Sequence, residues 1–292
     1  MNVLVTGANG QLGSELRCIA RNSRHSFIFS DVNEVPGEET VYLDITDREA
    51  LSIVTGSMSF DVIVNCAAYT DVDKAESDIA LAELLNCSAV ANLAELAKSR
   101  NATLIHISTD YVFPGTACRP IEERAVPDPK SVYGATKLAG ERAVLDSGCK
   151  SIIIRTAWLY SPFGKNFVKT MLSLTESNRS IKVVSDQVGT PTYAADLAAF
   201  IVGIIDNNRL EKTGIYHYSD EGAISWYDFA QAINELAGHS CEVLPCRSEE
   251  FPSKVQRPHY SVLDKSLAKS TFGISIPYWK DSLKKCLDRC LR

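Results

Sequence analysis

The sequence predicts an α/β protein with a doubly wound parallel sheet, followed by a smaller α/β domain. Short apolar runs alternate with helical segments over the first half of the chain, and a glycine-rich turn directly follows the first run. The alternation breaks after Trp158. Repeated strand–helix units form sheets whose strands run parallel and whose two faces are both covered by helices.

Six short runs of β-branched or aromatic residues are the predicted strands of this sheet. Most are continuous rather than alternating, which is typical of central strands buried on both faces. They lie at residues 3–5, 27–29, 41–43, 62–64, 104–107 and 152–154.

Leucines at helical spacing predict the clearest helix of the first half, at residues 79–98. Further helices are expected at residues 167–176, 194–205 and 227–237, mixed with short strands and a stretch that contains Pro245, Pro252 and Pro258.

We expect two domains from this pattern. Residues 1–158 form the sheet domain, to which part of residues 193–223 returns. Residues 159–292 mainly form the smaller domain, which closes over the first.

Composition excludes several classes of protein. The 292 residues carry a net charge of −6 and no basic block, which argues against a nucleic-acid partner. The longest apolar stretch noted, residues 197–205, is shorter than the roughly 20 residues of a membrane helix, so no membrane partner is expected. Nine scattered cysteines without a CxxC pair indicate reduced thiols and a cytoplasmic location.

The turn after the first strand has the spacing GxxGxxG, formed by Gly7, Gly10 and Gly13. Glycines allow a tight strand-to-helix turn and let a pyrophosphate approach the backbone N–H groups at a helix N-terminus. A Rossmann-type dinucleotide site is therefore predicted here. A plain glycine-rich turn is the alternative.

Asp31 follows the second strand, where a carboxylate accepts hydrogen bonds from an adenosine ribose. Such a residue favours NADH over NADPH without excluding NADPH, and a helix cap or turn acid is its alternative role. Asp44 and Ile45, after the third strand, are candidates for contact with the adenine, with a structural role as the alternative.

Tyr133 and Lys137 lie four residues apart, on one face of a predicted helix. An ammonium near a phenol favours its ionised form and lowers its pKa from about 10, which yields an acid able to protonate a carbonyl oxygen. Thr109 ends an apolar strand, at the edge where open α/β sheets bind ligands. A surface Tyr–Lys pair and a capping threonine are the alternative.

Together these residues resemble the extended short-chain dehydrogenase/reductase superfamily. More narrowly, six stretches resemble the dTDP-4-dehydrorhamnose reductase family along nearly the whole chain. The stretches are NCAAYTDVDKAE, STDYVFPG, VYGATKLAGE, RTAWLY, DQVGTPTYAADLA and QRPHYSVLD.

The resemblance implies reduction of the C4 ketone of dTDP-4-dehydro-β-L-rhamnose, with NADPH or NADH as hydride donor. Tyr133 would protonate the alkoxide, Lys137 would lower the phenol pKa and bind the nicotinamide ribose, and Thr109 would orient the carbonyl. A homodimer is common in the family, and some members place Mg²⁺ at the interface, for which no ligands are assigned here.

The resemblance also implies two sets of binding residues. The cofactor set comprises Gly7, Gly10, Gln11, Leu12, Gly13, Asp31, Asp44, Ile45, Ala68, Tyr69, Tyr133 and Lys137. The substrate set comprises Thr70, Val72, Thr109, Asp110, Tyr133, Trp158 and Arg257.

Three of the aromatic and basic assignments have alternatives. Arg257 would clamp the substrate pyrophosphate with paired hydrogen bonds or form an interdomain salt bridge. Trp158 is expected to contact ligand rather than serve only as a core aromatic, whereas Trp226 is expected to be structural.

Other activities remain open as alternatives. A sugar-nucleotide dehydratase would need an acidic residue after Thr109-Asp110, where this chain has Tyr111. A related epimerase is not excluded by the motifs. A non-catalytic subunit similar to the regulatory subunit of methionine adenosyltransferase is the alternative from a different class.

Overall fold

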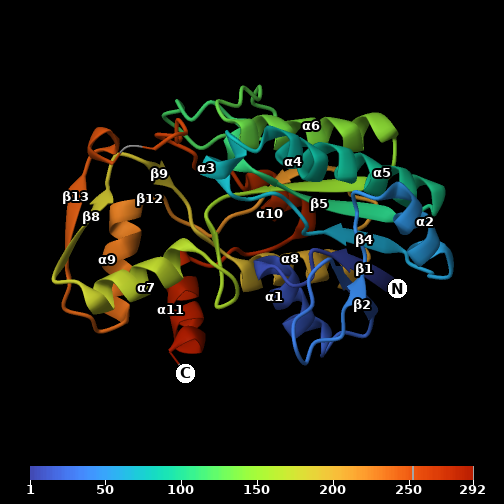
Figure 1. Ribbon diagram of the computed structural model, residues 1–292, viewed down its shortest axis with the longest axis horizontal. Coiled ribbons are helices and arrows are strands. Elements are labelled where there is room, and N and C mark those ends of the chain that lie inside the picture. The colour runs from blue at the N-terminus through green and yellow to red at the C-terminus, as the bar shows by residue number, and fades with distance from the viewer. Residues whose placement is uncertain (252, 292) are drawn as a thin grey trace.

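The computed structural model describes residues 1–251 and 253–291 and is built around a seven-stranded parallel sheet (Figure 1). The strand order is β11-β6-β5-β4-β1-β2-β3, and the crossover between β1 and β4 marks the point where the order reverses. The strands are β1 (Asn2–Thr6), β2 (Ser26–Asp31), β3 (Val41–Tyr42), β4 (Val62–Asn65), β5 (Thr103–Thr109), β6 (Ser151–Thr156) and β11 (Gly214–His217).

Helices cover both faces of the sheet, as the continuous apolar strands predict. Figure 1 shows α5 (Ala89–Ser99) and α6 (Val132–Ser147) on one face, with α1 (Gln11–Ala20) and α8 (Ala194–Asp206) on the other. α2 (Arg48–Gly56) joins the first layer, and α10 (Ser266–Phe272) packs with the second. Each layer closes one hydrophobic cluster against the strands.

Two segments from the second half of the chain therefore belong to this sheet layer. β11 pairs with β6, and α8 packs against α1, within the region expected to return to the first domain. α10 also contributes Ala268 to the same cluster, although the sequence division placed residues 266–272 with the second domain. A helix of seven residues carries too short an apolar pattern to show which core it joins.

One helical run is long and apolar enough, by length and composition alone, to cross a membrane. It spans Ile79–Ser99 with a mean hydropathy of 1.4, and joins α4 (Ile79–Glu83), a π-helical turn (Leu84–Ser88) and α5. The expectation of no such segment overlooked this run. Val90, Leu93 and Ala97 pack into the cluster behind the sheet, and a core helix with this packing passes the same test.

The rest of the chain forms a smaller layered unit beside the sheet. Its helices are α7 (Phe167–Ser177), α9 (Trp226–Leu236) and α11 (Trp279–Cys290), which share a cluster centred on Phe229. Short strand pairs flank them: β8 (Ser180–Val184) with β13 (Glu242–Cys246), β9 (Val188–Gly189) with β12 (Ile224–Ser225), and β7 (Leu159–Tyr160) with β10 (Thr192–Tyr193).

A polar contact joins α11 to the first helix of the chain. The Arg289 guanidinium donates to both carboxylate oxygens of Glu15 on α1 at 2.8 Å, and to the Tyr193 hydroxyl at 2.6 Å. Because the Glu15 side chain is only 1% exposed, its carboxylate needs this cationic partner. The end of the second unit is thereby held against the helix that follows the glycine turn.

Candidate active site

A cavity of about 860 Å³ opens where the parallel strands end. Its lining comes from both units of the molecule. Fourteen residues from the two expected binding sets line it: Gly7, Gly10, Gln11, Leu12, Asp31, Ala68, Thr70, Val72, Thr109, Asp110, Tyr133, Lys137, Trp158 and Arg257. The carboxyl ends of strands around a reversal in strand order are the usual ligand site of open α/β sheets.

Four expected cofactor residues lie outside this lining. Gly13 faces Ala8 within the turn, where an added Cβ would lie 2.5 Å from the Ala8 backbone. The Asp44 carboxylate accepts hydrogen bonds from the N–H and hydroxyl of Thr46. Ile45 is buried behind the sheet, and the Tyr69 hydroxyl donates to Asp78. These four residues take part in local packing or hydrogen bonds, and their expected contacts with the cofactor stay predictions.

The glycine turn is shaped to admit a group close to its backbone. Gly7 has φ +65°, and a Cβ there would lie 2.5 Å from the Ala67 nitrogen, so only glycine fits. Gly10 caps α1 without any side-chain hydrogen bond. The first N–H groups of this helix are therefore left for an anion, as a dinucleotide pyrophosphate requires.

Gln11 connects this turn to the second unit. Its side-chain oxygen accepts a hydrogen bond from Asn166 at 2.9 Å, and the Gly164 position lies against the Gln11 side chain. Lys165 and Asn166 also line the cavity, although neither belongs to a recognisable sequence motif. A loop of the second unit thus borders the expected pyrophosphate position.

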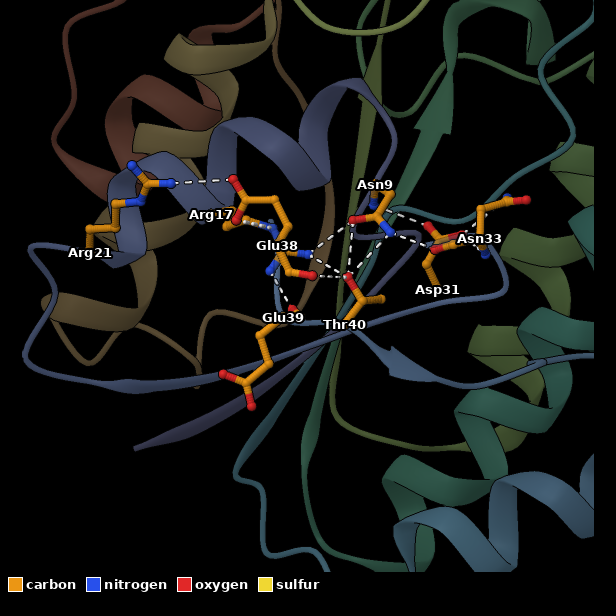
Figure 2. Close-up of polar contacts among 8 residues, drawn as sticks. All are labelled: Asn9, Arg17, Arg21, Asp31, Asn33, Glu38, Glu39 and Thr40. Carbon is orange, nitrogen blue, oxygen red and sulfur yellow. Dashed lines mark hydrogen bonds and ion pairs between the residues drawn. The ribbon is translucent and has the colours of Figure 1, made fainter. Parts of the chain in front are cut away.

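Asp31 ends β2 and lies beside Asn9 of the glycine turn (Figure 2). Its carboxylate accepts hydrogen bonds from the backbone N–H groups of Asn9 at 3.0 Å and Asn33 at 2.9 Å. The side chain is partly buried and lines the cavity, as a ribose-binding carboxylate would.

Thr109 and Tyr133 meet through a close approach of two elements. Thr109 ends β5, and Tyr133 lies in the first turn of α6, whose N-cap Ser131 accepts from the Gly134 N–H. An added Cβ on Gly134 would lie 2.2 Å from the Tyr111 carbonyl oxygen, so glycine lets the helix reach the end of the strand. Both side chains line the cavity.

Lys137 is buried one turn further along α6. Its ammonium donates to the Ile107 carbonyl on β5 at 2.6 Å. Burial lowers the pKa of Lys137 to about 8, while the negative charge of Glu141 acts in the opposite direction. The cation is therefore held by the strand that ends in Thr109.

Burial raises the pKa of Tyr133 above its ordinary value, and hydrogen bonding with Thr109 offsets this only in part. The expected lowering by Lys137 is not seen, because desolvation dominates and the ammonium is engaged with the strand carbonyl. Tyr133 is consequently protonated at neutral pH, which is the form that can donate a proton.

A buried ion pair between Glu141 and Arg155 lies next to Thr109 and Lys137. Glu141 on α6 accepts two hydrogen bonds from the Arg155 guanidinium on β6, at 2.8 and 2.6 Å, and one from the Ser108 hydroxyl. Both charged side chains are 2% exposed. The pair ties α6, β5 and β6 together next to Thr109 and Lys137.

Asp110 follows Thr109 and is also buried at the cavity. Burial raises its pKa to about 6, although the neighbouring Ser261 and Thr109 hydroxyls act in the opposite direction. The Thr109 hydroxyl donates to one carboxylate oxygen at 3.1 Å, whereas the other oxygen is buried and has no hydrogen-bond partner in the described residues.

Two tryptophans form the aromatic wall of the cavity. The rings of Trp158 and Trp226 stack with centroids 3.5 Å apart and planes within 9°. Trp158 has a positive φ of 48°, and its ring also lies against Gly189, where an added Cβ would be 2.6 Å from it. Trp226 was expected to be structural, yet it lines the cavity as well. Trp226 lies 68 residues after Trp158, and the spacing of apolar residues does not predict a contact at that separation.

Arg257 lines the cavity and forms an ion pair with Asp73 on α3 (Val72–Ala75). The two side chains are 31% and 44% exposed. The structure thus shows the salt bridge that was one of the two expectations for Arg257, at a position that also borders the ligand space.

Further lining residues were missed because they belong to no side-chain motif. Cys66, Ala67, Ile107 and Ser108 lie at or just beyond strand ends, and their position after an apolar run was the available signal. Asn33 belongs to the loop after β2.

Within residues 1–251 and 253–291, no group of three or more His, Cys, Asp or Glu side chains is placed to hold a metal ion.

Comparisons with known proteins agree with this architecture. The family model described as "RmlD substrate binding domain" matches residues 1–292. A curated dTDP-4-dehydrorhamnose reductase from Aggregatibacter actinomycetemcomitans is 38% identical, with 97% of each chain covered.

Two crystal structures of relatives resemble the whole chain. A dTDP-4-dehydrorhamnose reductase from Clostridium acetobutylicum has a TM-score of 0.93 at 42% identity, with 100% of both chains covered. The enzyme from Bacillus anthracis, solved in complex with NADP, has a TM-score of 0.90 at 36% identity, with 99% of both covered.

The sheet, the glycine turn and the Thr–Tyr–Lys corner define a nicotinamide-dependent oxidoreductase of the Rossmann type. Within that class, the chain belongs to the dTDP-4-dehydrorhamnose reductase family.

Proposed function

We propose that this protein reduces the C4 ketone of dTDP-4-dehydro-β-L-rhamnose to dTDP-β-L-rhamnose with NADH or NADPH, the last step of dTDP-L-rhamnose biosynthesis. The observation that carries the proposal is that Thr109, Tyr133 and Lys137 line the same cavity as the glycine turn. The named relatives support the sugar nucleotide as substrate class.

The residues present fit a nicotinamide dinucleotide. Gly7 and Gly10 leave space at the N-terminus of α1 for the pyrophosphate, Asp31 offers a carboxylate to the adenosine ribose, and Lys137 lies where the nicotinamide ribose would be held. When bound, the reduced nicotinamide supplies a hydride to the sugar C4.

Tyr133 supplies the proton that completes the reduction. Its phenol is protonated at neutral pH and gives its proton to the sugar O4, while the carbonyl carbon gains the hydride, so that the product is a secondary alcohol. The Thr109 hydroxyl orients the same oxygen. Donors fixed where negative charge develops favour the transition state over the ground state.

Lys137 acts on the cofactor rather than on Tyr133. Its ammonium is fixed by the Ile107 carbonyl within the same buried corner, where it would bind the nicotinamide ribose. After proton transfer the Tyr133 phenolate takes a proton back from solvent.

The second unit supplies the substrate side. We propose that the deoxysugar packs near the Trp158–Trp226 stack, where an apolar face suits a 6-deoxy ring. Arg257, with Thr70 and Val72, borders the adjoining part of the cavity and would face the nucleotide diphosphate. In this proposal, residues 1–158 with β11 and α8 hold the cofactor, and most of residues 159–292 hold the sugar nucleotide.

The alternatives are less well supported. The relatives do not favour an epimerase or a regulatory subunit resembling that of methionine adenosyltransferase. We propose a cytoplasmic location, which the nine free cysteines support, and a homodimer, which light scattering of the purified protein would test.

Absorbance of the reduced nicotinamide tests the proposed reaction. Purified protein is mixed with NADH or NADPH and the 4-keto sugar nucleotide, made in situ by the preceding dehydratase and epimerase. We expect loss of one equivalent of reduced cofactor for each dTDP-L-rhamnose formed. Cofactor binding without oxidation, with the keto sugar present, would contradict the proposal.

A further inference from the structure

The ion pair between Arg257 and Asp73 lies at the rim of the cavity and joins the two units. Arg257 lines the cavity and belongs to the segment that follows β13, whereas Asp73 is on α3. A terminal guanidinium nitrogen donates to the carboxylate at 2.5 Å, and both side chains are partly exposed. An exposed ion pair contributes little to stability, because water screens both charges. A ligand with more negative charge can therefore displace Asp73 from Arg257.

Asp73 holds more than the guanidinium. Its other carboxylate oxygen accepts a hydrogen bond from the Ser253 hydroxyl at 3.0 Å. That hydroxyl in turn accepts from the Val255 backbone N–H at 3.2 Å and from the Arg257 Nε at 3.4 Å. One carboxylate on α3 thus fixes both ends of the segment of residues 253–257.

The main chain next to Arg257 is anchored separately from this ion pair. Gly115 has φ +76°, and an added Cβ there would lie 2.5 Å from the Pro258 Cα. The Tyr260 N–H donates to the Gly115 carbonyl at 3.0 Å. Because this backbone is packed against the segment after β5, Arg257 can change its partner by rotating its side chain alone.

On its other side, Arg257 neighbours a tyrosine of the cavity wall. Burial raises the pKa of Tyr111 to about 12, and the nearby positive charge of Arg257 acts in the opposite direction. Tyr111 lines the cavity, and its ring meets the Tyr133 ring edge-on, with centroids 5.5 Å apart. Arg257 therefore lies between a carboxylate at the rim and a wall that continues to the proposed proton donor.

The distribution of charge in the cavity assigns a ligand to Arg257. Within the described residues, the cations of the lining are Lys137, Lys165 and Arg257. Lys137 is fixed by a strand carbonyl, and Lys165 belongs to the loop that contacts Gln11 at the glycine turn. Arg257 is the cation left for a second diphosphate, to which a planar guanidinium can donate two parallel hydrogen bonds.

We propose that Asp73 is a positioning residue that holds Arg257 at the rim of the cavity and yields it to the diphosphate of the incoming sugar nucleotide. The carboxylate and the diphosphate compete for one guanidinium, so Asp73 lowers the affinity for the ligand that displaces it. This inference rests on the proposed function, because it takes a nucleoside diphosphate sugar as the ligand.

Calorimetric titration with dTDP, without cofactor, tests the inference. Arg257→Met should weaken dTDP binding about tenfold, because it removes the cation. Asp73→Asn keeps the shape of the side chain and removes its charge, and should tighten dTDP binding about threefold. Unchanged or weaker binding in Asp73→Asn would overturn the inference.

The double variant tests whether Asp73 acts through Arg257. In the Arg257→Met background, Asp73→Asn should change dTDP affinity by less than about 1.5-fold, because no guanidinium is left to release. An equal gain in both backgrounds would show that Asp73 repels the diphosphate directly, and would overturn the inference.

Two further variants separate the ion pair from charge in general. Asp128→Asn removes the same charge from an exposed pair with Lys130, outside the cavity lining, and should leave dTDP affinity unchanged. Asp73→Glu keeps the carboxylate and should bind dTDP as the unmodified protein does. A gain in either variant equal to that of Asp73→Asn would overturn the inference.

The remaining outcomes distinguish this inference from the proposed function. If dTDP binds equally well to Arg257→Met, the inference fails and the proposed reduction stays intact. If the unmodified protein does not bind dTDP, both fail. If Asp73→Asn does not fold, Ser253→Ala removes the second contact of Asp73 and should tighten dTDP binding about twofold. Unchanged affinity in Ser253→Ala would then overturn the inference.

Discussion

The two walls of the cavity are built in different ways. The proposed catalytic wall, which carries Thr109, Tyr133 and Lys137, consists of a strand end and a helix joined by buried polar contacts, with Lys137 on the Ile107 carbonyl and Glu141 on Arg155. The aromatic wall consists of stacked tryptophans and a partly exposed ion pair from segments distant in sequence. Proton transfer needs donors that are fixed before the reaction, whereas an aromatic surface tolerates small shifts of a sugar.

The largest effect should come from the catalytic wall itself. Tyr133→Phe removes the proton donor and should lower kcat about 10²- to 10⁴-fold, with NADH affinity changed less than about twofold. Stopped-flow absorbance and fluorescence titration measure the two quantities. Tyr218→Phe, a buried tyrosine outside the cavity lining, is the control. Intact turnover in Tyr133→Phe would contradict the assignment of the proton donor.

The buried ion pair beside this wall, between Glu141 and Arg155, should contribute to the free energy of unfolding. Glu141→Gln leaves the Arg155 charge buried without its partner, and should lower the free energy of unfolding by about 3–5 kcal/mol in urea denaturation. Glu95→Gln breaks the exposed pair with Arg48 and should cost less than about 1 kcal/mol. If both variants lose a similar free energy of unfolding, burial does not determine how much each ion pair contributes to stability.

The aromatic wall should affect substrate affinity rather than the chemical step. Trp158→Ala removes the ring stacked on Trp226 and should raise KM for the sugar nucleotide about tenfold, with NADH affinity unchanged. Trp279→Phe, in the core of the second unit and outside the lining, is the control. A fall in kcat without a change in KM would show that Trp158 acts in the chemical step rather than in substrate binding.

A further effect is a pH dependence. The pKa of Lys137 is lowered to about 8, so its ammonium loses its proton as the pH rises through that value. If the charged form holds the ribose, kcat/KM for NADH should fall above pH 8 by up to about tenfold per pH unit. Lys137→Met should bind NADH weakly with a flat profile over this range. An unmodified protein with a flat profile to pH 9.5 would exclude this role.

The catalytic wall was also the wall that the sequence predicted. The glycine turn, the strand ending at Thr109 and the pair Tyr133 and Lys137 depend on spacing within one element or at its end. Their catalytic roles stay predictions, but their convergence follows from the topology of a parallel sheet.

The remaining features depend on contacts between distant segments. Trp226 reaches the cavity only because the second unit brings it against Trp158, and Ile45 is buried because the chain turns inward after β3. The sequence does not name the partner of Arg257, since Asp73 lies 184 residues earlier in the chain. The raised pKa of Tyr133 likewise comes from desolvation, which spacing does not report.

The contact between Arg289 and Glu15 links α11 to α1, the helix that follows the glycine turn. Glu15 lies on α1, the helix whose N-terminus faces the cavity, so opening of α11 strips a buried carboxylate of its partner. Local unfolding of the two helices is therefore coupled. Amide hydrogens of α11, remote from the cofactor, should exchange more slowly with solvent deuterium when a dinucleotide is bound.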